Sequence, residues 1–185
     1  MKAILRTAAV GAAIASFGIA SAASAATNDE AQVTAEILTA LSVDVDPADD
    51  TLDFGTIADG GIVGATDLVV GNDGVRGTCP ALLQCGGSTD APTFRITGLS
   101  GLAVDISVRN STESLNLPVG TLVPVGFASA MTVRNFTVAE SDGSNNGNIT
   151  LDGTDSFTVG GTLAVNPNQY PGIYSGTLTV DVAYN

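Results

Sequence analysis

The sequence predicts an all-β fold, an immunoglobulin-like antiparallel β-sandwich, for most of its 185 residues. In several segments apolar residues occupy every second position, as they do in strands that are buried on one face. Clusters of Gly, Asn, Asp and Pro separate these segments and supply turns. The number of short alternating segments is typical of a sandwich or a barrel.

The clearest strand is predicted over residues 102–108, where four apolar side chains share one face. The C-terminal run 177–184 alternates in the same way. Shorter strands are predicted over residues 52–57, 67–70, 93–97, 131–139 and 157–165. In the fourth of these segments the apolar positions change parity, and in the fifth Gly160 and Gly161 interrupt the pattern. Both irregularities predict β-bulges.

The first 25 residues are predicted to be a signal peptide that is cleaved. Lys2 and Arg6 precede a short apolar run, and Ala-Ser-Ala at 23–25 is the small-residue pattern that signal peptidase cuts. We therefore expect an exported protein, located in the periplasm, on the outer cell surface or outside the cell. The remaining chain has four arginines against 19 acidic residues, a net charge of −15, and neither lysine nor histidine.

This composition excludes several classes of function. Without histidine the mature chain cannot build a Ser-His-Asp triad or an imidazole metal site. A strongly acidic surface repels nucleic acid and anionic membranes. No apolar run after the signal peptide approaches the ~20 residues of a membrane-spanning helix. No motif combines a nucleophile, a base and an oxyanion donor, so the sequence predicts a non-enzymatic protein.

Two cysteines, Cys79 and Cys85, bracket the short segment CPALLQC. In an oxidising compartment they most simply form a local disulfide. A redox role is not indicated, because the spacing is not C-x-x-C and no basic neighbour activates either thiol. One cysteine pair without histidine also cannot supply the four ligands of a structural zinc site.

The segment 26–40, which precedes the predicted domain 41–185, has two interpretations. Thr27 and Glu30 form a capping-box pattern, and apolar residues follow at helical spacing. The odd positions from 31 to 45 are apolar except for Thr39, which indicates strand instead. The alternation has more matches than the helical pattern, so strand is the favoured prediction.

A run of acidic residues supplies the candidate metal ligands Asp44, Asp46, Asp49, Asp50 and Asp53. Calcium takes about six to eight oxygen ligands, and the loop ESDGSNNGN offers further donors in Glu140, Asp142 and Asn145. The spacing does not fit an EF-hand loop, and the alternative is that these residues form solvated turns. Glycoside hydrolysis by a carboxylate pair is not indicated, because nothing places two carboxylates across a cleft. Calcium is thus the one cofactor that the sequence suggests.

Three segments carry a resemblance to a known family: LDFGTI, FRITGLSGLAVDIS and the ending GGTLAVNPNQYPGIYSGTLTVDVAYN. Together they resemble the bacterial family called domain of unknown function 4402 over nearly the whole mature chain. More distantly, the order V-x-A-x-I, L-x-V, LDFG and the C-terminal motif are similar to the spore coat U domain and to subunits of archaic chaperone-usher pili. In those subunits an N-terminal strand of one protomer completes the incomplete sandwich of the next.

Carried over to this chain, the resemblance implies a donor strand from Ala31 to Ile37, whose alternating apolar residues are Val33, Ala35 and Ile37. It implies a fimbrial or coat subunit whose partners are further copies of itself and a periplasmic chaperone. The pilin relatives usually place a cysteine where Leu41 stands, so the disulfide here lies elsewhere. The alternative is a monomeric binding module, in which the same segment is an edge strand of its own sandwich and calcium stabilises the fold.

Overall fold

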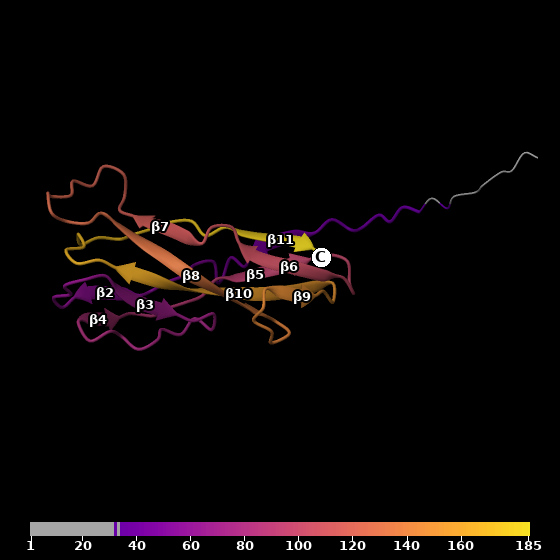
Figure 1. The fold of residues 1–185 in the computed structure, drawn as a ribbon, viewed down its shortest axis with the longest axis horizontal. Helices are drawn as coiled ribbons and strands as arrows, with labels where there is room; N and C mark the ends of the chain where they lie inside the picture. Colours follow the sequence, from indigo (N-terminus) through magenta and orange to yellow (C-terminus); the bar gives the residue numbers. More distant parts are fainter. Residues whose placement is uncertain (1–31, 33) are drawn as a thin grey trace, which may run out of the picture. The chain divides into compact units, whose positions relative to one another are not determined.

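The computed structural model describes residue 32 and residues 34–185. The predicted signal peptide and Val33 lie outside the described residues. All of the described strands belong to residues 37–185, which form one compact unit. Within the described part of the chain the regular structure is entirely β and antiparallel, as Figure 1 shows. Among these residues there is no helix that is long and apolar enough to cross a membrane.

The strands form one large sheet and two small ones. In the large sheet the strand order is β1 (Ser42–Val45), β5 (Thr93–Thr97), β10 (Thr154–Val165), β8 (Ala130–Glu140), β7 (Thr112–Asn116). A further strand, β3 (Thr66–Val70), pairs with the second half of β10. A second sheet has the order β11 (Val180–Tyr184), β6 (Ala103–Val108), β9 (Asn148–Thr150). A third pairs β2 (Thr56–Asp59) with β4 (Leu83–Gly86).

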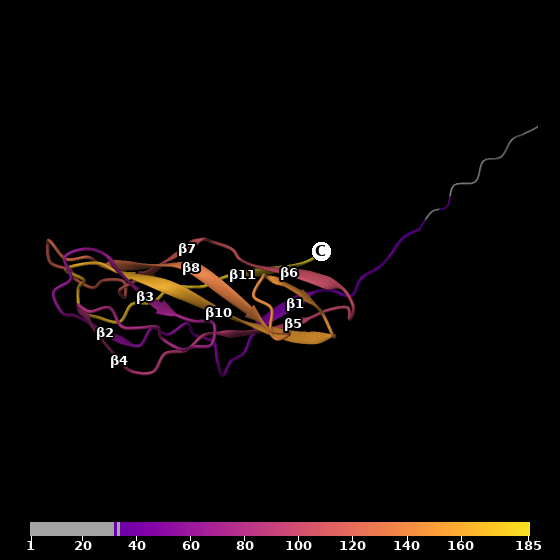
Figure 2. The same cartoon turned by 60° about the horizontal axis from the view of Figure 1, so that its bottom comes forward.

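The first two sheets are parts of one curled surface. β6, in the second sheet, and β7, in the large sheet, are consecutive in the chain with only residues 109–111 between them. One continuous stretch of chain therefore contributes a strand to each sheet. The last segment follows this stretch along its length, because Ser175 bridges Asn116 and β11 pairs with β6. The result is a half-barrel that runs from β1 through β5, β10, β8 and β7 to β11 (Figure 2).

The two predicted bulges are the two sides of one irregularity between β8 and β10. Gly160 lies opposite Thr137 and Thr162 lies opposite Arg134, so Asn135 and Phe136 together face the single residue Gly161. Asn135 has a positive φ of 50°, which fits the extra residue of a bulge. Gly160 is needed for close approach, because a Cβ there would lie 2.5 Å from the backbone nitrogen of Asn72.

The apolar side chains gather in two clusters under this surface. The first joins β3 and the ends of β8 and β10 to the β2–β4 pair, and contains Phe54, Ile62, Leu68, Val70, Leu83, Val133, Leu163 and Val165. The second lies between β5, β10 and the β6–β9–β11 sheet, and contains Phe94, Ile96, Val104, Ile106, Ile149, Leu151, Phe157 and Val159. Phe136, beside the bulge, packs against both clusters.

The predicted strands are confirmed with shifted ends, and one needs correction. Residues 52–57 do not form one strand, because the chain turns at Gly55 (φ 73°) and β2 begins at Thr56. The Asp53 carboxylate accepts a hydrogen bond from the Gly55 N–H at 2.8 Å and fixes this turn. In the described part of the segment 26–40, residues 34–40 form neither a helix nor a strand and are exposed.

Candidate functional site

A groove separates the two ends of the half-barrel. We call it the edge groove; its volume is about 400 Å³, and it lies between the chain following β1 and the chain leading into β11. One wall includes Val45 and Leu52, and the other includes Tyr174 and Leu178. Its apolar lining is completed by Phe54, Phe94, Leu115, Val133 and Phe136. The groove therefore exposes the inner face of the curled sheet at the place where the sheet fails to close.

Both strands beside the edge groove have a free edge. The Asp46 N–H donates to the Thr93 carbonyl at 2.8 Å, so the alternate residues Val43 and Val45 turn their N–H and C=O groups away from β5. On the other side, the Arg109 N–H donates to the Thr179 carbonyl at 2.9 Å, so the peptide groups of β11 alternate in the same sense. Neither outward edge pairs with another described strand.

The outward peptide groups of β11 belong to Val180 and Val182, whose side chains pack on the second core cluster. At the end of this strand, Tyr184 ties the two edges together: its hydroxyl accepts from the Leu99 N–H at 2.7 Å and donates to the Thr39 carbonyl at 3.0 Å. The half-barrel is thus pinned at one end and open along the edge groove.

Of the three strand-donor candidates, the two that the structure describes are accessible to a second molecule. Ile37 is 94% exposed, and Ala35 is exposed as well. Val33 lies outside the described residues. Burying the Ile37 side chain elsewhere would remove an apolar group from water without uncovering any core of this domain.

The structure does not gather the five aspartates into a metal site. The Asp46 carboxylate bonds to the Arg95 guanidinium at 2.6 Å, which lowers the pKa of Asp46, as does the N–H of Ala48. Asp50 accepts from the Thr51 hydroxyl, and Asp53 is used in the turn at Gly55. Among residues 32 and 34–185, no group of three or more His, Cys, Asp or Glu side chains could hold a metal ion.

The later acidic loop is likewise built around its own backbone. Glu140 is only 4% exposed, and one oxygen of its carboxylate accepts from the Gly147 N–H. The Ser144 hydroxyl and N–H both bond to the Asp142 carboxylate and lower its pKa. Glu140 therefore points inward, while Asp142 caps a turn at the surface.

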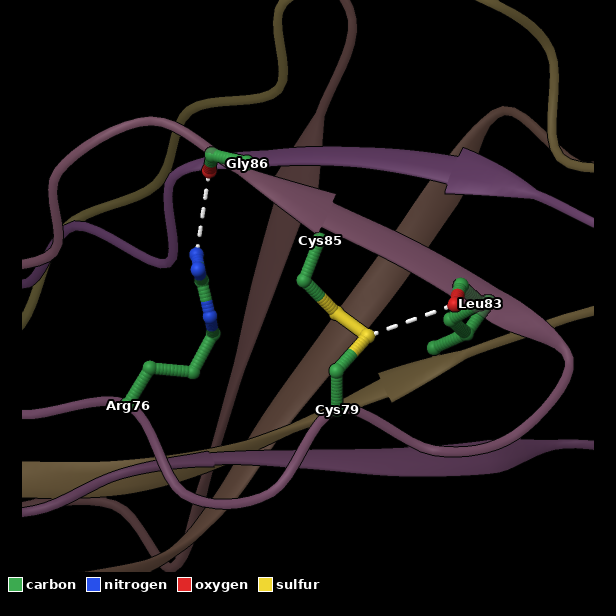
Figure 3. Close-up of a disulfide and its surroundings, with 5 residues drawn as sticks. All are labelled: Arg76, Cys79, Leu83, Cys85 and Gly86. Atoms are coloured by element: carbon green, nitrogen blue, oxygen red, sulfur yellow. Dashed lines mark hydrogen bonds between the residues drawn. A yellow bond between two sulfur atoms is a disulfide. The ribbon is translucent and has the colours of Figure 1, made fainter.

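The predicted disulfide between Cys79 and Cys85 is present, with an S–S distance of 2.02 Å. Figure 3 shows it beside β4, close to the Leu83 carbonyl. In the same view the Arg76 guanidinium donates to the Gly86 carbonyl at 3.0 Å. Both half-cystines pack against the first core cluster, so the bridge fastens the β2–β4 pair to the domain.

The described residues thus define an all-β domain with an open sheet edge and an apolar groove. The chain belongs to the family described as Domain of unknown function (DUF4402), whose model matches residues 43–184. The match begins inside β1 and ends inside β11, so it spans the whole half-barrel. Among curated proteins, none matches this chain.

The edge groove was not visible in the sequence, because its walls come from segments more than 100 residues apart. Each wall contributes a few apolar residues that resemble ordinary strand positions. The sequence gives only an indirect indication of the groove. The first and last strands of the domain, β1 and β11, are both alternating strands, and each lies at an edge of its sheet.

Proposed function

We propose that this protein is an exported structural subunit that associates by strand addition. In this proposal residues 31–37 of one copy enter the edge groove of another, and the half-barrel is an incomplete immunoglobulin-like sandwich of the pilin kind. The observation that carries the proposal is the edge groove itself, which adjoins the C-terminal end of β1 and the chain leading into β11, two strands with unpaired outward peptide groups.

An added strand gains main-chain hydrogen bonds and apolar contacts at the same time. The peptide groups of Val43 and Val45 on one edge, and of Val180 and Val182 on the other, supply donors and acceptors. The groove lining supplies apolar contact through Phe94, Leu115 and Phe136 and their neighbours. An edge that is free in the monomer is a template for such pairing.

The N-terminal segment matches these requirements. Its apolar residues alternate, so one face of an extended strand carries Val33, Ala35 and Ile37 while the other carries Gln32, Thr34 and Glu36. The described part, residues 34–40, is exposed and forms neither a helix nor a strand. Its bond to the Tyr184 hydroxyl is made by Thr39, which lies outside the proposed donor residues 31–37, so these residues have no regular structure to lose when they enter a neighbour.

The geometry of the proposal allows open chains of subunits. The donor and the acceptor are different surfaces, so each subunit can give a strand to one neighbour and accept a strand from another. A periplasmic chaperone is the expected partner before assembly, because a free apolar groove invites wrong pairing.

The test is the association state of residues 26–185, measured by sedimentation velocity over a range of concentrations. The proposal predicts concentration-dependent oligomers that disappear when residues 26–40 are removed and do not disappear with Thr34→Asp, which places a charge on the polar face. Monomers at every concentration in the absence of any added peptide would contradict it.

A further inference from the structure

A second groove opens where β6 and β8 part. β7 and β8 pair as far as Thr112 and Arg134. One residue further on, β8 bulges at Asn135, and β6 turns to pair with β9 instead. The space between the diverging strands is a groove of about 790 Å³, which lies within the usual size of ligand sites. We call it the amide groove.

The lining of the amide groove is uncharged, although the chain has 19 acidic and six basic residues. Five asparagines from four separate segments surround it: Asn72, Asn110, Asn135, Asn145 and Asn146. The side chains of Asn110 and Asn146 bond to Glu113 and to the Asn148 N–H. Those of Asn72, Asn135 and Asn145 make no hydrogen bond to another described residue. Each free amide offers both donors and an acceptor.

The floor of the amide groove is apolar. Ile106, Val108, Phe136 and Val138 line it, and all four belong to or pack against the second core cluster. The groove therefore pairs an apolar floor with amide groups that can donate and accept. A saccharide has the matching surface, because its rings carry apolar C–H faces and a rim of hydroxyl groups. Neutral amides suit neutral hydroxyls, and no lining charge would be left unpaired by such a ligand.

Two hydrogen bonds to Gly147 fix the loop that carries Asn145 and Asn146. The Ile106 N–H donates to the Gly147 carbonyl at 2.7 Å, and the buried Glu140 carboxylate accepts from the Gly147 N–H. Gly147 has a positive φ of 73°, so the loop has a defined backbone path at this point. Pre-organised polar groups of this kind cost less entropy when a ligand binds.

We propose that the amide groove binds a neutral oligosaccharide. The site is separate from the edge groove, and the proposal does not depend on strand addition. It assigns Asn72, Asn135 and Asn145 as hydrogen-bonding residues and Phe136 as part of the apolar floor. Acidic saccharides bind more weakly, because the surrounding domain is strongly acidic.

The experiment is an NMR titration of isotope-labelled residues 26–185, carrying Ile37→Asp to keep the protein monomeric. The probes are maltohexaose, cellohexaose, mannohexaose and xylohexaose, with a hexamer of galacturonic acid as the acidic comparison. We expect at least one neutral hexasaccharide to shift the side-chain NH₂ signals of the groove asparagines. The double variant Asn72→Ala/Asn145→Ala should weaken that binding about tenfold, while the matched variant Asn166→Ala/Asn185→Ala should not.

Several results would overturn the proposal. These are no shift with any of the four neutral probes, shifts confined to residues outside the amide groove, tighter binding of the acidic hexamer, or equal loss in both double variants. Melting temperatures of the variants separate loss of the site from loss of the fold. Strand addition is measured independently by sedimentation, so failure of either proposal leaves the other standing.

Discussion

Replacing Ile37 with aspartate separates strand addition from ordinary folding. In a single subunit this side chain is 94% exposed, so the change should alter the free energy of unfolding by no more than about 0.5 kcal/mol. In the edge groove of a neighbour the same side chain would be buried, which contributes about 1.5–3 kcal/mol. A carboxylate in its place adds a desolvation cost.

A loss of about 3 kcal/mol corresponds to roughly 100-fold weaker association. The assays are sedimentation velocity for association and thermal unfolding for the domain, with Thr34→Asp as the matched control. We expect Ile37→Asp to dissociate the oligomers and to melt at the temperature of wild-type protein that has been diluted until it is monomeric. A melting temperature several degrees below that of the monomeric wild type would contradict this, because Ile37 would then belong to its own fold. Equal association of the two aspartate variants would contradict it as well.

Three further predictions concern the domain itself. Replacing both Cys79 and Cys85 with serine should cost about 2 kcal/mol, the chain-entropy estimate for so short a loop; denaturant unfolding measures this, and an unchanged midpoint would contradict it. Leu163→Ala should cost about 2–5 kcal/mol, because the side chain is 1% exposed in the first core cluster; a loss below about 1 kcal/mol in the same assay would contradict it. The N–H groups of Ile62 and Gly61 lower the pKa of Asp59 below 3.8. The resulting stability is fully present above the unfolded pKa and is lost as the pH falls through the lower folded pKa, so Asp59→Asn should flatten the melting temperature profile below about pH 4. Parallel profiles for the two proteins would show that the carboxylate is not stabilising.

The sequence predicted the strands wherever one face of the strand is buried and the other is exposed to solvent. β5 and β6 alternate cleanly because they lie over the second core cluster. β4, β7 and β9 were not predicted, because each is short and carries only one or two apolar residues. The bulge between β8 and β10 was indicated in the sequence of both strands. In β8 the alternation of apolar residues changes parity, because Asn135 and Phe136 together face the single residue Gly161 of β10.

The sites were less readable than the strands. The disulfide followed from proximity in the chain, and the donor candidates followed from alternation and resemblance. The aspartates of 44–53 were grouped in sequence, yet the fold spreads them over an ion pair and separate turns. Both grooves form where neighbouring strands diverge. The curl of the sheet determines these places, and no local sequence pattern does.

The most direct measurement of strand addition is residue-level amide hydrogen exchange. The sample is monomeric Ile37→Asp protein, compared with and without a synthetic peptide of residues 28–40 that keeps isoleucine at 37. The account predicts that the peptide slows exchange at the outward N–H groups of Val43, Val45, Val180 and Val182, and that a peptide with aspartate at 37 does not. Unchanged exchange at all four amides, at a peptide concentration that saturates any binding, would contradict it.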